Sequence, residues 1–153
     1  MNTVISQEKT VLSTSQSSPT GQSVLIIEDE SQYANFLKTV LEDHGYTVRV
    51  ASNADQALCL ANEDAPNLIT LDLLMPGKTG IKLYRELRTR DDLHNTKIVI
   101  LTGLDTDSHG LCSYDEFFKR ISEKGHVTKP DAYLTKPIEA ELFMNSINRV
   151  MNN

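Results

Sequence analysis

Five polar side chains in this sequence could together bind a metal ion and transfer a phosphoryl group. Glu28 and Asp29 form an acidic pair, Asp72 follows an apolar run, and Thr102 and Lys136 add a hydroxyl and an ammonium group. Carboxylates that lie close together repel one another unless a cation lies between them, and Mg²⁺ prefers carboxylate, water and phosphate oxygens. With such a cation, an aspartate can attack phosphorus and form an aspartyl phosphate, while the ammonium and hydroxyl groups stabilise the transferring oxygens.

These side chains share one kind of position, because each follows or ends a segment with the pattern of a buried β-strand. Short runs of apolar or β-branched residues predict strands, and apolar residues spaced three or four apart predict helices. The two patterns alternate five times from Val24 onwards. The predicted strands are 24–27, 46–51, 68–71, 97–101 and 132–135, and the predicted helices are 33–41, 54–61, 81–87, 117–121 and 142–150.

Strict alternation of strands and helices predicts an α/β fold with a parallel sheet and helices on both faces. The smallest such arrangement is the flavodoxin-like doubly wound fold, a five-stranded parallel sheet of order 2-1-3-4-5. In that order strands 1 and 3 are neighbours, and ligand sites form beyond the carboxyl ends of the strands. We therefore expect Glu28, Asp29 and Asp72 to converge on one crevice, flanked by Thr102 and Lys136.

The composition fits one acidic domain and argues against several classes of function. The chain has 153 residues, 39% of them hydrophobic, and a net charge of −6. Without a basic tail or stripe, it is a poor match for nucleic acid, whose phosphates attract Lys and Arg. The longest apolar runs are too short to span a membrane, and the N-terminus lacks a secretory h-region, so we expect a cytoplasmic protein. Cys59 lies in an apolar helical pattern and is predicted to be a small core residue.

Four short motifs, each at a predicted strand end, give this pattern a family resemblance. The motifs are Ile-Ile-Glu28-Asp29-Glu, Leu-Asp72-Leu-Leu-Met-Pro-Gly-x-x-Gly80, Ile-Leu-Thr102-Gly103 and Tyr133-Leu-Thr-Lys136-Pro137. In this order they resemble the receiver domain of two-component response regulators, of the stand-alone, single-domain type. A second Thr-Lys-Pro occurs at Lys129, but only the one at Lys136 follows a β-type run and opens a helical pattern.

The resemblance implies a role for each residue that matches a family motif. Asp72 matches the phosphoacceptor and a Mg²⁺ ligand, and Asp29 matches a second carboxylate ligand. Glu28 matches its acidic neighbour at the metal, and the backbone carbonyl of Leu74 matches the third protein ligand. Lys136 matches the phosphate-binding lysine.

The resemblance also implies a conformational switch. Thr102 matches the hydroxyl that moves to the phosphoryl group, and Tyr133 matches the aromatic that then turns inward. Gly103 matches the small residue that leaves access for the phosphodonor. The bond between Lys136 and Pro137 is usually cis in the family.

The implied function is that of a phosphoacceptor response regulator in a two-component histidine kinase phosphorelay, signalling through protein–protein interaction. The expected partners are a histidine kinase or histidine phosphotransfer protein and an output protein that the sequence does not name. The chain ends with the last predicted helix, so we expect no separate catalytic or DNA-binding domain. It is then not an enzyme, apart from hydrolysing its own aspartyl phosphate.

Three features depart from the family pattern or add to it. The polar segment 1–22 predicts a flexible N-terminal tail before a receiver domain at 23–153. The segment between strands 4 and 5 is extended at 104–114 and 124–131, which predicts a modified docking surface. Leu74 and Leu104 lie two residues after Asp72 and Thr102, where neither can orient an attacking water, so self-dephosphorylation should be slow.

The same residues weigh against three other functions. A phosphorylation-independent binding module on the receiver fold remains an alternative, although such proteins usually lack the acceptor, the acid pair or the lysine. A haloacid-dehalogenase-like phosphatase needs an Asp two residues after the nucleophile, where this chain has Leu74. A flavodoxin needs a phosphate loop rich in Ser, Thr and Gly, whereas Glu28, Asp29 and Glu30 would repel a phosphate.

Overall fold

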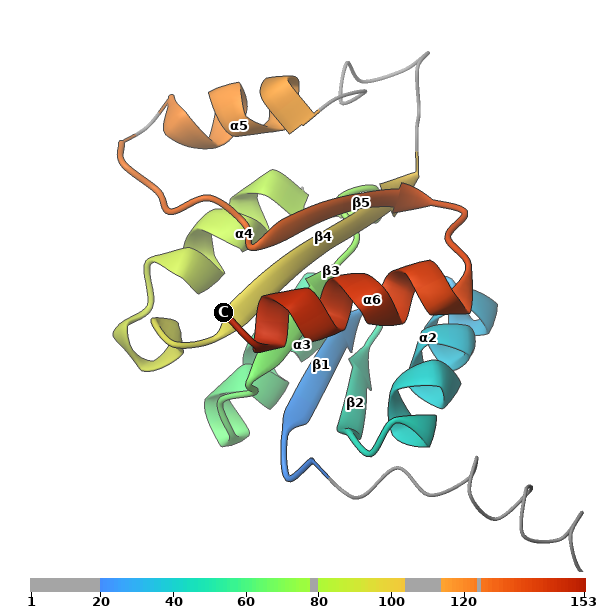
Figure 1. Cartoon of the computed structure of the whole chain (residues 1–153). Helices are drawn as coiled ribbons and strands as arrows, with labels where there is room; N and C mark the ends of the chain where they lie inside the picture. Colours follow the sequence, from blue (N-terminus) through green and yellow to red (C-terminus); the bar gives the residue numbers. More distant parts are fainter. Residues whose placement is uncertain (1–19, 78–79, 104–113, 124) are drawn as a thin grey trace, which may run out of the picture.

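The computed structural model describes residues 20–77, 80–103, 114–123 and 125–153 (Figure 1). Five parallel strands form one sheet in the order β2-β1-β3-β4-β5, which confirms the predicted topology. The strands are β1 (Ser23–Ile27), β2 (Thr47–Ala51), β3 (Leu68–Leu71), β4 (Lys97–Gly103) and β5 (Ala132–Lys136). The helices are α2 (Ser31–Asp43), α3 (Ala54–Glu63), α4 (Gly80–Arg88), α5 (Tyr114–Ser122) and α6 (Ala140–Met151), with a short 3-10 helix η1 (Asp91–Leu93).

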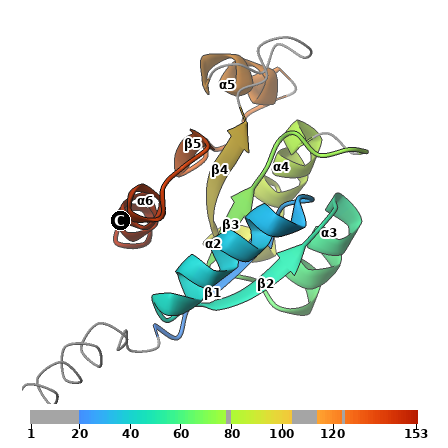
Figure 2. The same cartoon turned by 90° about the vertical axis from the view of Figure 1, so that its right-hand side faces the viewer.

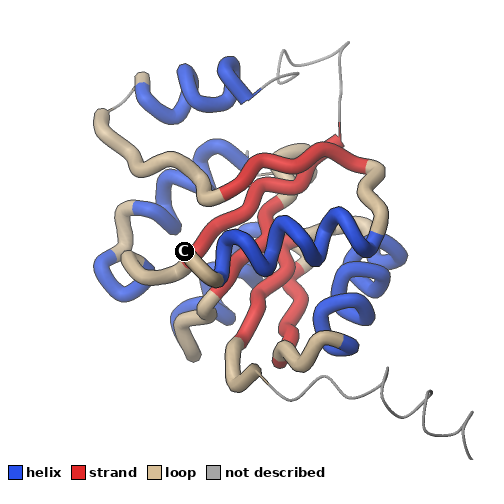
Figure 3. Tube along the Cα trace, in the orientation of Figure 1, coloured by secondary structure: helices blue, strands red, loops and turns tan. Residues whose placement is uncertain are grey.

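The helices form two layers around the sheet, as Figures 2 and 3 show. Helices α2 and α6 pack on one face, and their apolar side chains meet those of Val24, Ile26 and Val99. Helices α3 and α4 pack on the other face, where Leu25 and Ile69 point. Alternate residues of the central strands therefore enter different cores, which explains why β1 and β3 are almost uninterrupted apolar runs.

Helix α5 lies beyond the β5 end of the sheet and packs mainly against α4 (Figures 1 and 2). Arg85 of α4 donates hydrogen bonds to the carbonyl oxygens of Arg120 and Ile121 at the end of α5, at 3.0 and 2.7 Å. These carbonyls belong to the last turn of α5, where a helix has no partners of its own for them. Arg85 therefore caps α5 and joins it to α4.

The segment that precedes β5 is also bonded to α4. The hydroxyl of Tyr84 donates to the carbonyl of Thr128 at 2.5 Å, and the guanidinium of Arg88 pairs with Asp131 at 2.7 Å. The same carboxylate oxygen of Asp131 accepts the backbone N–H of Ile98 in β4. Of the predicted extension, Thr128 and Asp131 are thus held by polar contacts, whereas residues 104–113 and 124 lie outside the described residues.

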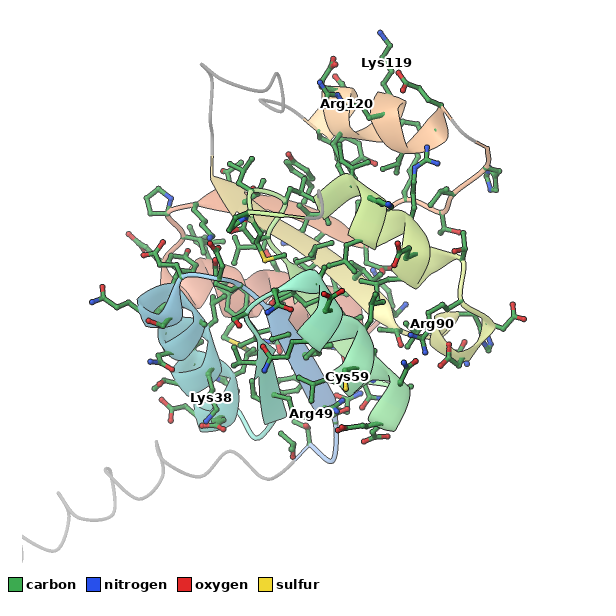
Figure 4. All side chains as sticks on the ribbon, turned by 180° about the vertical axis from the view of Figure 1, so that it is seen from behind. Lys38, Arg49, Cys59, Arg90, Lys119 and Arg120 are labelled. Atoms are coloured by element: carbon green, nitrogen blue, oxygen red, sulfur yellow. The ribbon has the colours of Figure 1, made fainter. Side chains whose placement is uncertain are left out.

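One sequence prediction was wrong: Cys59 is exposed and does not belong to the core (Figure 4). Helix α3 begins after Asn53, whose side chain accepts the N–H of Gln56 at 2.8 Å as an N-cap. From there it buries Ala54, Ala57 and Ala61 against the sheet. Cys59 lies two residues from both Ala57 and Ala61, which turns it away from this face. In the sequence, Leu58 and Leu60 beside Cys59 make the apolar face of this helix look wider than the buried stripe of alanines is.

Two boundaries differ from the sequence predictions. Strand β4 continues to Gly103, so Thr102 lies inside the strand and not just beyond it. At the other end of the chain, Thr20 and Gln22 were placed in the tail, yet both bond to the entry of β2. Thr20 N–H donates to Gly45 O, and Gln22 O accepts from Thr47 N, each at 3.0 Å. Residues 1–19 lie outside the described part of the chain.

Candidate functional site

The five polar residues singled out in the sequence meet at the carboxyl edge of the sheet. Backbone hydrogen bonds place the acids, because Glu28 N–H donates to Ala51 O at 3.0 Å and Asp72 N–H donates to Ile27 O at 3.1 Å. These bonds extend the β1–β2 and β3–β1 pairings by one residue. The side chains at the strand ends therefore start from fixed backbone positions, side by side across the sheet.

Three carboxylates form a cluster that could hold one cation. One oxygen from each of Glu28, Asp29 and Asp72 lies within 4.8 Å of the others. Glu28 is 2% exposed and Asp72 5%, while Asp29 is open to solvent. Two buried carboxylates beside an exposed one fit Mg²⁺, which binds through few protein oxygens and keeps several of its waters. The donor set therefore suits the predicted metal.

Lys136 joins the two buried carboxylates. Its ammonium donates a hydrogen bond to Oε1 of Glu28 and lies 3.2 Å from Oδ2 of Asp72. Burial raises the pKa of Glu28 to about 7; the hydrogen bond from Lys136 opposes this rise and the charge of Asp72 adds to it. Burial alone would lower the pKa of Lys136, but its bonds to Glu28 and Asp72 outweigh burial and raise it. Lys136 thus stays cationic beside the acids.

The carboxylate of Asp72 is held by donors on both of its oxygens. Oδ1 accepts the hydroxyl of Thr102 at 3.0 Å and the backbone N–H of Leu74 at 2.9 Å, and Oδ2 faces Lys136. A carboxylate fixed in this way has a defined direction of attack on an electrophile. Of the two candidate lysines, Lys136 reaches the acids, whereas Lys129 lies over the ring of Phe118 at 4.9 Å.

Glycines shape the loop that follows Asp72. A methyl group on Gly80 would lie 2.8 Å from the carbonyl oxygen of Leu73 and closer still to its Cα, so only glycine lets α4 begin this near the loop. A methyl group on Gly103 would meet Cδ1 of Leu74 at 3.9 Å. The side chain of Leu74 therefore lies over Gly103, at the same edge of the sheet as Asp72. The sequence contained Gly80 in a motif without revealing this contact.

Tyr133, the predicted switch aromatic, lies on β5 in an aromatic cluster. Its ring centroid is 5.6 Å from that of Phe117 and 5.5 Å from that of Tyr114, and its side chain is half-buried. It thus contacts α5, the helix after the extended segment. The peptide bond between Lys136 and Pro137 is cis, as the family resemblance predicted.

One residue at the site was missed in the sequence. The sequence pattern places Tyr33 of α2 only on the apolar face of a helix, yet its ring covers the ammonium of Lys136, which lies 4.5 Å from the ring centroid. The two residues are more than one hundred positions apart. No local spacing could reveal this contact, because it depends on the start of α2 lying close to the end of β5 and the segment that follows it.

Comparison with known proteins identifies the family. The family sequence model described as "Response regulator receiver domain" matches residues 24–148 of this chain. The chain belongs to the receiver domain family. As a receiver, it has the phosphoacceptor role of two-component signalling, and the family points to signalling and not to an enzymatic activity. Receiver domains typically bind Mg²⁺ and interact with histidine kinases or phosphotransfer proteins.

Relatives of this receiver include both short and long proteins. Protein PilH of Pseudomonas aeruginosa is 27% identical over 128 residues, which cover 84% of this chain and 96% of that protein. The transcriptional regulatory protein YkoG of Bacillus subtilis is 34% identical over 107 residues, 70% of this chain but only 44% of its own length. This receiver therefore spans about half the length of the transcriptional regulators that it matches.

Solved structures agree with the fold. A response regulator from Chloroflexus aurantiacus superimposes with a TM-score of 0.72 and 24% identity, covering 89% of this receiver and all of that chain. At this identity the likeness shows the fold alone. None of the helices in the described residues is both long and apolar enough to cross a membrane.

Proposed function

We propose that Asp72 is the phosphoacceptor of this receiver and that the surrounding residues assist the transfer. The proposal is supported above all by the position of the Asp72 carboxylate, which accepts hydrogen bonds from Thr102 and Leu74 and faces the ammonium of Lys136. In the reaction, a carboxylate oxygen of Asp72 forms a bond to phosphorus. The bond from phosphorus to the donor breaks, and its electron pair leaves with the donor group.

The acidic cluster is the proposed Mg²⁺ site. Asp29, Asp72 and the backbone carbonyl of Leu74 would hold the ion, with Glu28 as an additional acid beside it. When bound, Mg²⁺ would neutralise charge on the transferring phosphoryl oxygens. Asp29 suits this role best among the acids because it is open to solvent, where hydrated ions arrive.

Lys136 and Thr102 are proposed to bind the phosphoryl group once it is attached. Both contact Asp72 directly, one with a positive charge and one with a hydroxyl donor. The hydroxyl of Thr102 would exchange its hydrogen bond to Oδ1 of Asp72 for one to a phosphoryl oxygen. Tyr133, on the strand next to Thr102, would then change its packing against Phe117 and Tyr114. That movement would alter the α5–β5 surface and thereby affect an output protein.

The aspartyl phosphate is proposed to be long-lived. The side chain of Leu74 lies over Gly103 beside the acceptor. An apolar side chain there can neither orient nor deprotonate a water for attack on phosphorus. Leu104, the other apolar residue predicted to flank the acceptor, lies outside the described residues.

The first experiment combines the protein with acetyl phosphate and Mg²⁺ and measures the intact mass. We expect a gain of one phosphoryl group that requires Mg²⁺ and is absent from Asp72→Asn, which keeps the size of the side chain. A folded wild-type protein that gains no mass would refute the proposal. Equal labelling of Asp72→Asn would instead place the acceptor at another residue.

A further inference from the structure

Tyr33 contacts the ammonium of Lys136 from a helix that sequence reasoning did not connect with the site. The ammonium nitrogen lies 4.5 Å from the centroid of the Tyr33 ring, well within the range of a cation–π interaction. The other neighbours of this nitrogen are the carboxylates of Glu28 and Asp72. Two acids and one aromatic face therefore surround a lysine that is 14% exposed.

The hydroxyl of Tyr33 makes a second contact on the same segment. It accepts the backbone N–H of Ile138 at 3.4 Å, two residues after Lys136 and just past the cis peptide bond. The ring also packs edge-on against Phe36, with centroids 5.7 Å apart. One half-buried side chain thus touches both the charge of Lys136 and the loop that leaves β5.

The helix that carries Tyr33 is tied to the acidic pair. Helix α2 begins at Ser31, two residues after Asp29, and Glu30 N–H donates to a carboxylate oxygen of Glu28 at 3.2 Å. Tyr33 therefore has a fixed position relative to the acids on β1. Through its ring, this position also limits where the Lys136 ammonium can lie.

We propose that Tyr33 is a positioning residue for phosphoryl transfer, holding the ammonium of Lys136 beside Asp72 before the phosphodonor arrives. This inference rests on the proposed role of Asp72 as the acceptor. A lysine side chain is flexible and strongly hydrated, so an unrestrained ammonium would turn toward water. Placing the charge in advance removes that reorganisation from the reaction, which is where preorganised groups accelerate transfer.

The ring should also remain a neighbour of Lys136 while its other partners change. When Asp72 is phosphorylated, the ammonium must exchange part of its carboxylate contact for a phosphoryl oxygen. The face of Tyr33 carries no formal charge and does not compete for the metal or the phosphoryl group. It can therefore guide the ammonium in both states.

The first test compares wild type, Tyr33→Leu and Tyr33→Phe in the rate of phosphorylation by acetyl phosphate at saturating Mg²⁺. Tyr33→Leu removes the ring, and we expect a rate that is roughly 3- to 10-fold lower. Tyr33→Phe keeps the ring and loses only the long hydrogen bond to Ile138, so it should retain more than half of the rate. Circular dichroism spectra check that all three proteins are folded.

A second measurement separates positioning from a general structural effect. Calorimetry measures the affinity for the phosphoryl mimic beryllofluoride with Mg²⁺, for Tyr33→Leu in the wild-type and Lys136→Met backgrounds. Because Tyr33 acts through Lys136, the substitution should weaken binding in the first background and leave the second unchanged. If Tyr33→Leu weakens beryllofluoride binding equally in both backgrounds, or is phosphorylated at the wild-type rate, the proposed role of Tyr33 is wrong. The proposed role of Asp72 would not be affected by either result. A wild-type protein that is never phosphorylated would overturn both proposals.

Discussion

Thr102 donates its hydroxyl to Oδ1 of Asp72 at 3.0 Å, across the adjacent strands β4 and β3. The hydroxyl is buried, with Thr102 only 2% exposed, so few waters can replace this bond. In this conformation the hydroxyl is already a partner of the acceptor. The Thr102 hydroxyl must therefore break its hydrogen bond to the Asp72 carboxylate before it can donate to a phosphoryl oxygen.

Replacing Thr102 should slow phosphorylation without preventing it. Thr102→Ala removes a donor to a charged group, and part of its effect cancels because the donor is bonded before and after transfer. We expect a rate roughly 3- to 10-fold lower with acetyl phosphate. Thr102→Ser, which keeps the hydroxyl, is the matched control and should stay within about 3-fold of wild type. A slow Ser variant would show that the methyl group, and not the hydroxyl, matters.

Removing Asp29 should abolish stabilisation by Mg²⁺. An ion that binds only the folded state raises its stability, by about 3 kcal/mol at a free concentration ~100 times Kd. Thermal unfolding of wild type should therefore shift upward with Mg²⁺, and Asp29→Asn should not shift. Without metal, Asp29→Asn should be at least as stable as wild type, because one of three neighbouring negative charges is gone. A preserved Mg²⁺ shift would remove Asp29 from the metal site.

A polar side chain at position 74 should shorten the life of the aspartyl phosphate. Leu74→Asn can hydrogen-bond a water near phosphorus, so loss of the phosphoryl mass should be about tenfold faster than in wild type. Leu74→Met keeps an apolar side chain of similar volume and should decay at the wild-type rate. Decay is followed by intact mass after the phosphodonor is removed. Identical lifetimes for Asn and Leu would contradict the shielding role.

Adding a methyl group to Gly80 should destabilise the fold. The new carbon would overlap the backbone of Leu73, which leads directly from Asp72, and overpacking of this kind costs about 1–3 kcal/mol. Urea unfolding of Gly80→Ala measures the change. Gly103→Ala is the control, because its methyl group would meet only Leu74, at an ordinary distance of 3.9 Å. Equal stability of the two variants would argue against a close approach at Gly80.

Tyr84 should make the fold sensitive to alkaline pH. Burial raises its pKa from 10.0 to about 12, against the opposing effect of the hydrogen bond from Arg88. Below pH 10 the hydroxyl is protonated in both states, so its contribution is fully present. Between pH 10 and 12 only the unfolded state loses the proton, and stability should fall by about 2–3 kcal/mol. Tyr84→Phe should show a smaller fall than wild type in urea titrations across this range, because only the raised pKa values of groups such as Tyr46 and Lys136 remain.

The sequence was sufficient to predict the sheet order and to locate the site. The order followed from the strict alternation of strand and helix patterns. The site followed from the polar residues at the ends of the apolar runs, because parallel strands bring such ends together. Glu28, Asp72 and Lys136 meet as expected, although they come from three different strands. The periodicity of apolar residues also placed the helices to within a few residues of their observed ends.

Contacts between distant elements were beyond prediction from the sequence. Tyr33 and Lys136 meet only because the start of α2 lies close to the end of β5, and Gly80 reaches Leu73 only because of the path of one loop. The prediction that Cys59 is a core residue was wrong for a related reason. Its helix packs through a narrow stripe of alanines, and the width of a buried stripe depends on the distance between helix and sheet.

Helix α4 connects the acceptor with the far side of the receiver. Its first residue, Gly80, rests on the loop after Asp72, while Arg85 holds the end of α5 and Arg88 holds Asp131 before β5. The helix is only nine residues long, and its own backbone hydrogen bonds resist bending. A shift of the acceptor loop would therefore be passed through α4 to the end of α5 and to the residues that precede β5.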